Sequence, residues 1–141
     1  MRKLILSIFT VTILVSIAFA QNGKIKVDIF GIETIEGQLA IGLYNESDNF
    51  PDVSKAYKST FLEVTDENMT YIFSGIPNGE YAIALFHDSN NSGKLDKNFI
   101  GIPKEGYGFS KNVTGTFGPP HFGEAKFKLD SSYTAKIRIK Y

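Results

Sequence analysis

The chain has 141 residues, no cysteine, and 15 basic against 15 acidic side chains. The lack of cysteine excludes disulfides, thiol catalysis and cysteine-ligated metals, and so balanced a charge gives no electrostatic footprint for nucleic acid or an anionic membrane. A chain of this length suits one domain with a core of its own.

The first 20 residues have the pattern of an export signal. Arg2 and Lys3 precede an apolar run over residues 4–17, and Ala18-Phe19-Ala20 matches a small-x-small cleavage site. The alternative is a membrane anchor, but the run is shorter than the ~20 residues that span a bilayer. We therefore expect a signal peptide over residues 1–20 and export to the periplasm or the medium. No stable membrane anchor is expected after cleavage.

Alternating polar and apolar residues predict strands through the first part of the mature chain, residues 21–141. In one of them Leu39, Ile41 and Leu43 share a face, as in a half-buried strand. Residues 31–37 have a glycine at each end and predict an antiparallel hairpin between the first two strands. A short helical turn is expected at 53–57. The strands expected in this part cover residues 24–30, 38–44, 58–64, 69–73 and 80–87.

The strand at 80–87 is apolar on both faces. Tyr81, Ile83 and Leu85 share one face with His87, while small and aromatic residues occupy the other. Such a strand belongs in the middle of a sheet. Two further strands are expected at 124–129 and 133–141. About seven short strands with turns every ~8–12 residues predict one all-β domain, an immunoglobulin-like antiparallel β-sandwich.

The segment after the central strand, DSNNSGKLD at 88–96, is rich in oxygen. Oxygen-bearing side chains stand at relative positions 1, 3, 5 and 9, and glycine stands at position 6, as in a calcium loop. Phe99 replaces the glutamate expected at position 12, so the alternative is a turn whose side chains bond their own backbone. The predicted calcium ligands are Asp88, Asn90, Ser92, Lys94 (through its carbonyl) and Asp96.

Histidine and aromatic residues near this loop form a second group of candidates. The glycine-rich aromatic segments at 106–109 and 117–122 are either packed by their own side chains or exposed to a ligand or partner. A histidine at the end of a central strand is either structural or part of that surface. The candidate surface consists of His87, Tyr107, Phe109, Phe117, His121 and Phe122.

Two stretches of the sequence resemble known families. FHDSNNSGKLDKNFIGIPKEGYGFSKN at 86–112, followed by FGPPHF at 117–122, resembles the bacterial exported domain-of-unknown-function family 2141. That resemblance covers nearly all of the mature chain and implies no assigned activity. GIPNGEYAIALFHD at 75–88 is similar to the turn and strand of transthyretin-like and carboxypeptidase-regulatory-like sandwich domains, which implies the same fold class.

Three functions are compatible with these features. The leading hypothesis is a non-enzymatic exported binding or accessory module whose loop is ordered by calcium and whose partner is a protein or a small ligand. One alternative is a metal-dependent hydrolase that uses His87, Asp88 and His121. The other is a small-ligand carrier, as transthyretin-like domains can be.

Overall fold

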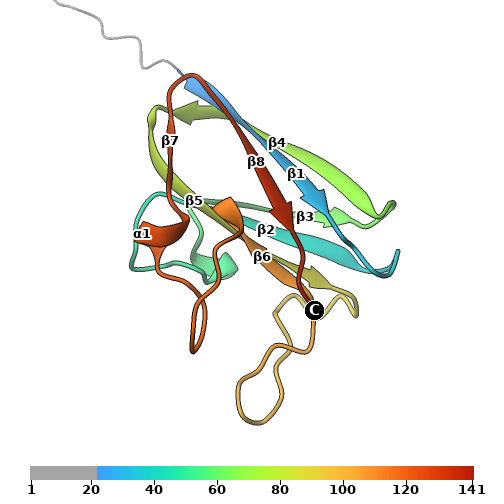
Figure 1. Cartoon of the computed structure of the whole chain (residues 1–141). Helices are drawn as coiled ribbons and strands as arrows, with labels where there is room; N and C mark the ends of the chain where they lie inside the picture. The colour runs from blue at the N-terminus through green and yellow to red at the C-terminus, as the bar shows by residue number, and fades with distance from the viewer. Residues whose placement is uncertain (1–21) are drawn as a thin grey trace, which may run out of the picture.

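The computed structural model describes residues 22–141, and the expected signal peptide lies outside them. Eight strands form two sheets around one core, which confirms the all-β sandwich (Figure 1). The strands are β1 (Asn22–Phe30), β2 (Gln38–Tyr44), β3 (Lys58–Glu63), β4 (Asn68–Pro77), β5 (Gly79–Asp88), β6 (Tyr107–Phe109), β7 (Phe127–Leu129) and β8 (Ser132–Arg138). Three single turns of helix are η1 (Val53–Lys55), η2 (Ser110–Asn112) and α1 (Phe122–Ala125).

The smaller sheet has the strand order β4-β1-β8, and the larger one has the order β3-β2-β5-β6, with β7 also paired to β5. All of these pairs are antiparallel except β1 with β8, which run parallel. The prediction of antiparallel pairing is therefore confirmed for every strand pair except β1 with β8. The short helix η1 lies within the helical turn predicted at 53–57.

The hairpin predicted between the first two strands is wrong. β1 pairs with β4 and β8, whereas β2 pairs with β3 and β5, so residues 31–37 cross from one sheet to the other. One face of β1 but both faces of β2 are buried, and β2 lies inside the larger sheet between β3 and β5. Side chains of β1 and β2 meet across the core instead of side by side within a sheet, as Ile25, Val27, Leu39 and Ile41 do, all of them fully buried.

The strand predicted at 124–129 is also partly wrong, since α1 occupies its first residues and β7 begins at Phe127. Two local contacts explain the turn of helix. The Glu124 carboxylate accepts a hydrogen bond from the His121 backbone N–H at 2.7 Å, and the buried Ser110 hydroxyl donates to the Ala125 carbonyl at 2.7 Å. These bonds satisfy groups that a strand here would have paired elsewhere.

β5 is the central strand that the sequence predicts, because β2 lies on one side of it and β6 and β7 lie on the other. Tyr81, Ile83 and Leu85 belong to the core between the sheets. On the opposite face Ala84 packs with Tyr44 and Phe109 in a second cluster. Both faces of β5 are therefore covered, and its end at Asp88 starts the candidate site from a fixed position.

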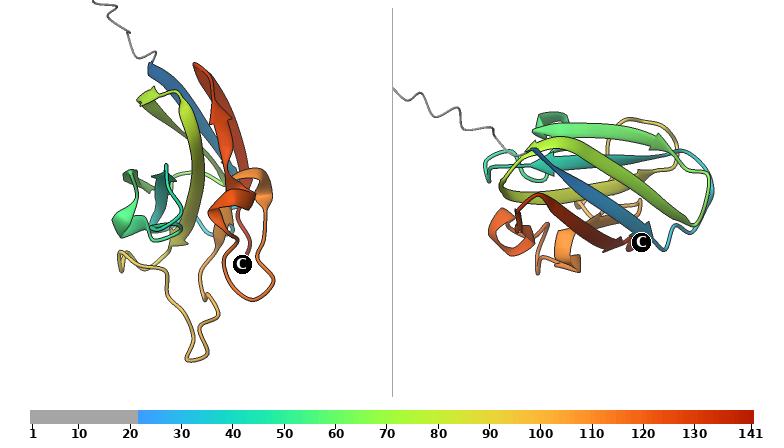
Figure 2. Two further views of the ribbon diagram at one scale, coloured as in Figure 1. Left: turned by 90° about the vertical axis from the view of Figure 1, so that its left-hand side faces the viewer. Right: turned by 90° about the horizontal axis from the view of Figure 1, so that it is seen from above.

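Two long loops leave the sandwich at one end. Figures 1 and 2 show the segment 89–106 (yellow to orange) projecting beyond the strands, with the segment 113–120 leaving the same end. No helix within residues 22–141 is both long and apolar enough to cross a membrane. The loop at 89–106 joins β5 to β6 and carries the oxygen-rich segment of the sequence.

Candidate functional site

The carboxylate of Asp88 is fully buried at the end of β5 and is surrounded by donors. Gln38 Nε2 donates to it at 2.8 Å, and the backbone N–H groups of Ser92 and Gly93 donate at 2.8 and 2.9 Å. The Ser92 hydroxyl adds a longer bond at 3.4 Å. A carboxylate has about four lone-pair positions, so these four donors occupy it, and the loop is wrapped around Asp88.

This environment keeps Asp88 charged. Burial alone would raise the pKa of its carboxyl, but the bonds from Gln38, Gly93 and Ser92 outweigh burial and hold the pKa below its usual value. Within residues 22–141 no cationic side chain forms an ion pair with it. The charge is therefore stabilised by N–H and O–H dipoles, which makes Asp88 an anchor for the loop.

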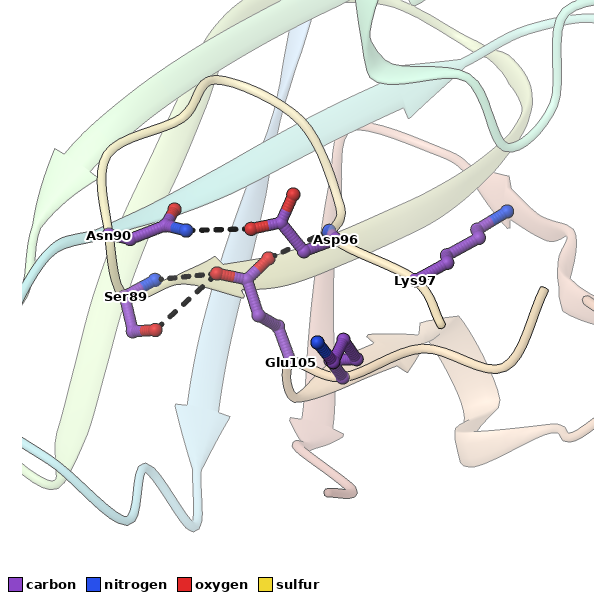
Figure 3. Close-up of a pocket in the computed structure, with 6 residues that line it drawn as sticks. Ser89, Asn90, Asp96, Lys97 and Glu105 are labelled. Carbon is purple, nitrogen blue, oxygen red and sulfur yellow. Dashed lines mark hydrogen bonds between the residues drawn. The ribbon is translucent and has the colours of Figure 1, made fainter. Parts of the chain in front are cut away.

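Glu105 is a second buried anchor, which no local pattern in the sequence indicates. Its side chain is only 8% exposed, and it returns to the loop from the segment just before β6. One oxygen accepts bonds from the Ser89 N–H at 3.1 Å and the Ser89 hydroxyl at 3.4 Å. The other accepts from the Asp96 N–H at 3.0 Å (Figure 3). Both ends of the oxygen-rich segment are thus tied to the sheet.

Beside Glu105 the loop encloses a polar cavity of about 460 Å³. Asn90 and Asp96 face each other at its edge, and Asn90 Nδ2 donates to an Asp96 carboxylate oxygen at 2.6 Å (Figure 3). Neither residue is buried, so the cavity is open to solvent. Its lining contains both carboxylates and amines: Ser89, Asn90, Asp96, Lys97, Lys104 and Glu105.

The five predicted calcium ligands lie in one loop, but many of their oxygens already accept hydrogen bonds. Asn90 Oδ1 accepts from the Ser92 N–H at 3.1 Å, and the Lys94 carbonyl accepts from the Ser92 hydroxyl at 2.9 Å. Together with the saturated Asp88, these are the contacts of a turn that bonds its own backbone. Asp96 differs, since one of its oxygens has no donor within the described residues.

Comparison with known proteins places the chain in a family. The model of a family described as an uncharacterized protein conserved in bacteria (DUF2141) matches residues 27–137. The chain belongs to this family. The resemblance of residues 86–122 to family 2141 is thereby confirmed, and the whole β5–β6 loop lies inside the matched region. No curated protein and no solved structure matches the chain.

His87 of this DUF2141 chain is a buried residue with both ring nitrogens occupied. Nδ1 lies 2.7 Å from the Tyr141 hydroxyl, and Nε2 lies 2.8 Å from the Glu36 carbonyl. A carbonyl only accepts, so the contacts assign the proton to Nε2 and leave Nδ1 to accept from Tyr141. In residues 22–141 no three His, Cys, Asp or Glu side chains gather as metal ligands. His87, Asp88 and His121 are therefore not brought together as the hydrolase hypothesis requires.

The predicted aromatic surface of the DUF2141 chain is divided into two parts. Phe109, with Tyr107 and Phe122 beside it, packs around Tyr44 on the outer face of the larger sheet. Phe50 fills the centre of this cluster, with its ring centroid 5.9 Å from that of Phe109. Phe117 and His121, in contrast, are exposed. The six residues therefore do not form one continuous surface.

Proposed function

We propose that this DUF2141 protein is an exported, non-enzymatic binding module, and that the polar cavity of its β5–β6 loop is the binding site. The observation that supports the proposal is the double anchoring of the loop. Asp88 and Glu105 are both buried, and each holds loop N–H groups by its carboxylate. The loop that lines the cavity is therefore ordered before a ligand arrives, which reduces the ordering cost of binding.

Calcium is the ligand that we propose for this cavity. Asp96, Asn90, Ser89 and Glu105 line one space and carry oxygen atoms, which is the ligand chemistry calcium prefers. Asp88 supports the loop and takes no direct part, because it accepts four hydrogen bonds and does not line the cavity, whereas Glu105 Oε2 accepts only the Asp96 N–H within the described residues. Water would supply the remaining ligands of a six- to eight-fold shell. With so few free charged ligands, the affinity is expected in the range of extracellular modules, about 10⁻⁴–10⁻³ M.

Calcium at a few millimolar should therefore stabilise the protein by about 1–2 kcal/mol. This raises the melting temperature by several degrees for a domain of this size. The test compares thermal melts in calcium, in magnesium and in chelator. Magnesium should have a smaller effect, because it requires a tight octahedral shell and gives up its own water reluctantly.

Two variants test whether the calcium-dependent shift in melting temperature arises in this cavity. Asp96→Asn removes the negative charge and one of the two carboxylate oxygens and should abolish the calcium shift, while the fold is kept because Asp96 accepts a single side-chain bond, from Asn90. Asp130→Asn is the matched control, since Asp130 is an exposed carboxylate near the start of β8 with a surface partner in Lys128. The control should respond to calcium as the wild type does. Equal melting temperatures of the wild type in calcium and in chelator would remove calcium as the ligand.

A further inference from the structure

The tip of the β5–β6 loop exposes three apolar side chains together. Phe99 is 99% exposed, Ile100 65% and Ile102 54%. They lie within four residues on the segment that projects farthest from the sandwich in Figure 1. Soluble proteins rarely leave neighbouring large apolar side chains in water without a use for them. The tip therefore has the character of a docking element.

The backbone of this tip is hydrogen-bonded within the tip itself. Asn98 Oδ1 accepts from the N–H groups of Ile100 and Ile102 at 3.1 and 2.9 Å. The Asn98 N–H donates to the Ile102 carbonyl at 2.9 Å, and the Gly101 N–H donates to the Asn98 carbonyl at 3.0 Å. Gly101 has φ +88°, a conformation that favours glycine. The backbone N–H groups of Asn98, Ile100, Gly101 and Ile102 are thus all bonded within the turn that carries the apolar side chains.

Positive charge lies on both sides of the tip. Lys97 and Lys104 flank it and are exposed, and no acidic residue stands between them. Within residues 22–141 neither lysine forms an ion pair with a carboxylate. The acidic residues next to the lysines in the chain are Asp96, which is half-buried, and Glu105, which is buried and bonded to the loop. Although the chain as a whole is neutral, the tip is locally cationic.

We propose that residues 97–104 dock on the surface of a lipid bilayer that contains anionic lipid. Phe99 and Ile100 would enter the boundary between headgroups and acyl chains, and the two lysines would contact the headgroups. Two observations favour a bilayer over a groove in a protein. A backbone that bonds itself suits a medium without donors of its own, and lysines on both arms complement an anionic surface.

A second loop supports the same orientation. Phe117 is fully exposed in the uncharged segment 113–120, which leaves the sandwich at the same end (Figure 2). Both loops could therefore face one membrane surface at once. The docking is peripheral and reversible and differs from a membrane-spanning anchor. Its apolar part is separate from the proposed calcium site, since Phe99, Ile100 and Ile102 do not line the cavity, although Lys97 and Lys104 do.

The absence of tryptophan from the chain allows a direct test. Phe99→Trp places a single tryptophan at the tip, and its emission should shift to shorter wavelength with vesicles of phosphatidylcholine and phosphatidylglycerol. Pure phosphatidylcholine vesicles should give a weaker response. Ile72→Trp is the control, because Ile72 is a 49% exposed apolar residue on β4, in the other sheet. Its emission should not change.

Vesicle sedimentation measures the contribution of each side chain. Phe99→Ser should lower the partition coefficient between vesicles and water at least about tenfold, because the aromatic side chain that enters the bilayer is lost. Lys97→Gln should lower it about fivefold. Ile72→Ser should leave it unchanged. The melting shift in calcium should persist in Phe99→Ser, so the two proposals fail separately.

Three results would overturn the docking proposal. The first is an emission of Phe99→Trp that is indifferent to anionic vesicles. The second is wild-type sedimentation that Phe99→Ser does not reduce, which would place the contact elsewhere on the molecule. The third is equal binding to vesicles with and without phosphatidylglycerol, which would remove the role of the lysines. If the tip does not bind vesicles but cross-links to a protein through position 99, its binding partner is a groove in that protein and not a bilayer.

Discussion

Replacement of Leu85 by alanine should lower the free energy of unfolding by about 2–5 kcal/mol, as large-to-small changes in a packed core do. Leu85 is 3% exposed and lies on the central strand β5. It stands opposite Ile41 of β2 and Gly108 of β6, so strands on both sides limit how far the cavity can collapse. Urea denaturation followed by circular dichroism measures the loss.

The control for this prediction is Ile72→Ala on the exposed face of β4. It removes a branched aliphatic side chain that is about half in water already, so the expected loss is well under that of Leu85→Ala. A loss below roughly 1 kcal/mol at Leu85 itself would contradict the central place of β5 in the sheet.

Asp88→Asn should lower the free energy of unfolding at neutral pH by about 2–4 kcal/mol, although the two side chains have almost the same shape. The wild-type carboxylate accepts from Gln38 and from the N–H groups of Ser92 and Gly93. In Asp88→Asn one carboxylate oxygen is replaced by an NH₂ group. This donor then faces other donors in a buried site. Hydrogen bonds to a charged group are also stronger than those to a neutral one.

The loss at Asp88 should depend on pH in a defined direction. The pKa of Asp88 in the folded protein lies below its ordinary value of 3.8. Its charge therefore adds stability that is complete above that ordinary value and is lost as the pH falls through the lower, folded pKa. The difference between wild type and Asp88→Asn should shrink accordingly as the pH drops below about 4.

Asp96→Asn is the matched control, because Asp96 lies in the same loop but is not buried and accepts one side-chain bond. Its loss at neutral pH should be below about 1 kcal/mol. A difference between wild type and Asp88→Asn that stays constant from neutral to acid pH would show that charge is not what Asp88 contributes.

Local patterns predict the strands well, because the alternation of apolar and polar residues along a strand indicates which of its faces is buried. β2 and β5 were expected at 38–44 and 80–87, and they are observed at Gln38–Tyr44 and Gly79–Asp88. The double burial of β5 also followed from apolar residues on both of its faces. The same alternation does not determine which other strand each strand pairs with. β1 and β2 were expected to form a hairpin, yet they lie in different sheets.

The candidate site is only partly visible in the sequence. The loop at 88–96 could be found because its oxygen-bearing residues follow a local spacing. Glu105 could not, because it reaches Ser89 and Asp96 through the return of the chain toward β6, and no local spacing encodes that return. β6 was not predicted, because it has only three residues and lies in a glycine-rich segment that shows no clear alternation.

A calcium titration followed by ¹H–¹⁵N spectra of the protein shows directly whether the cavity of the β5–β6 loop binds calcium. We expect saturable shifts of the amide signals of Ser89, Asn90 and Asp96, which line the cavity, at millimolar calcium. The same signals should stay in place for Asp96→Asn, and the amide of Ser132 at the start of β8 should not move in either protein. If the signals of the loop remain unmoved in the wild type, the cavity is not a calcium site.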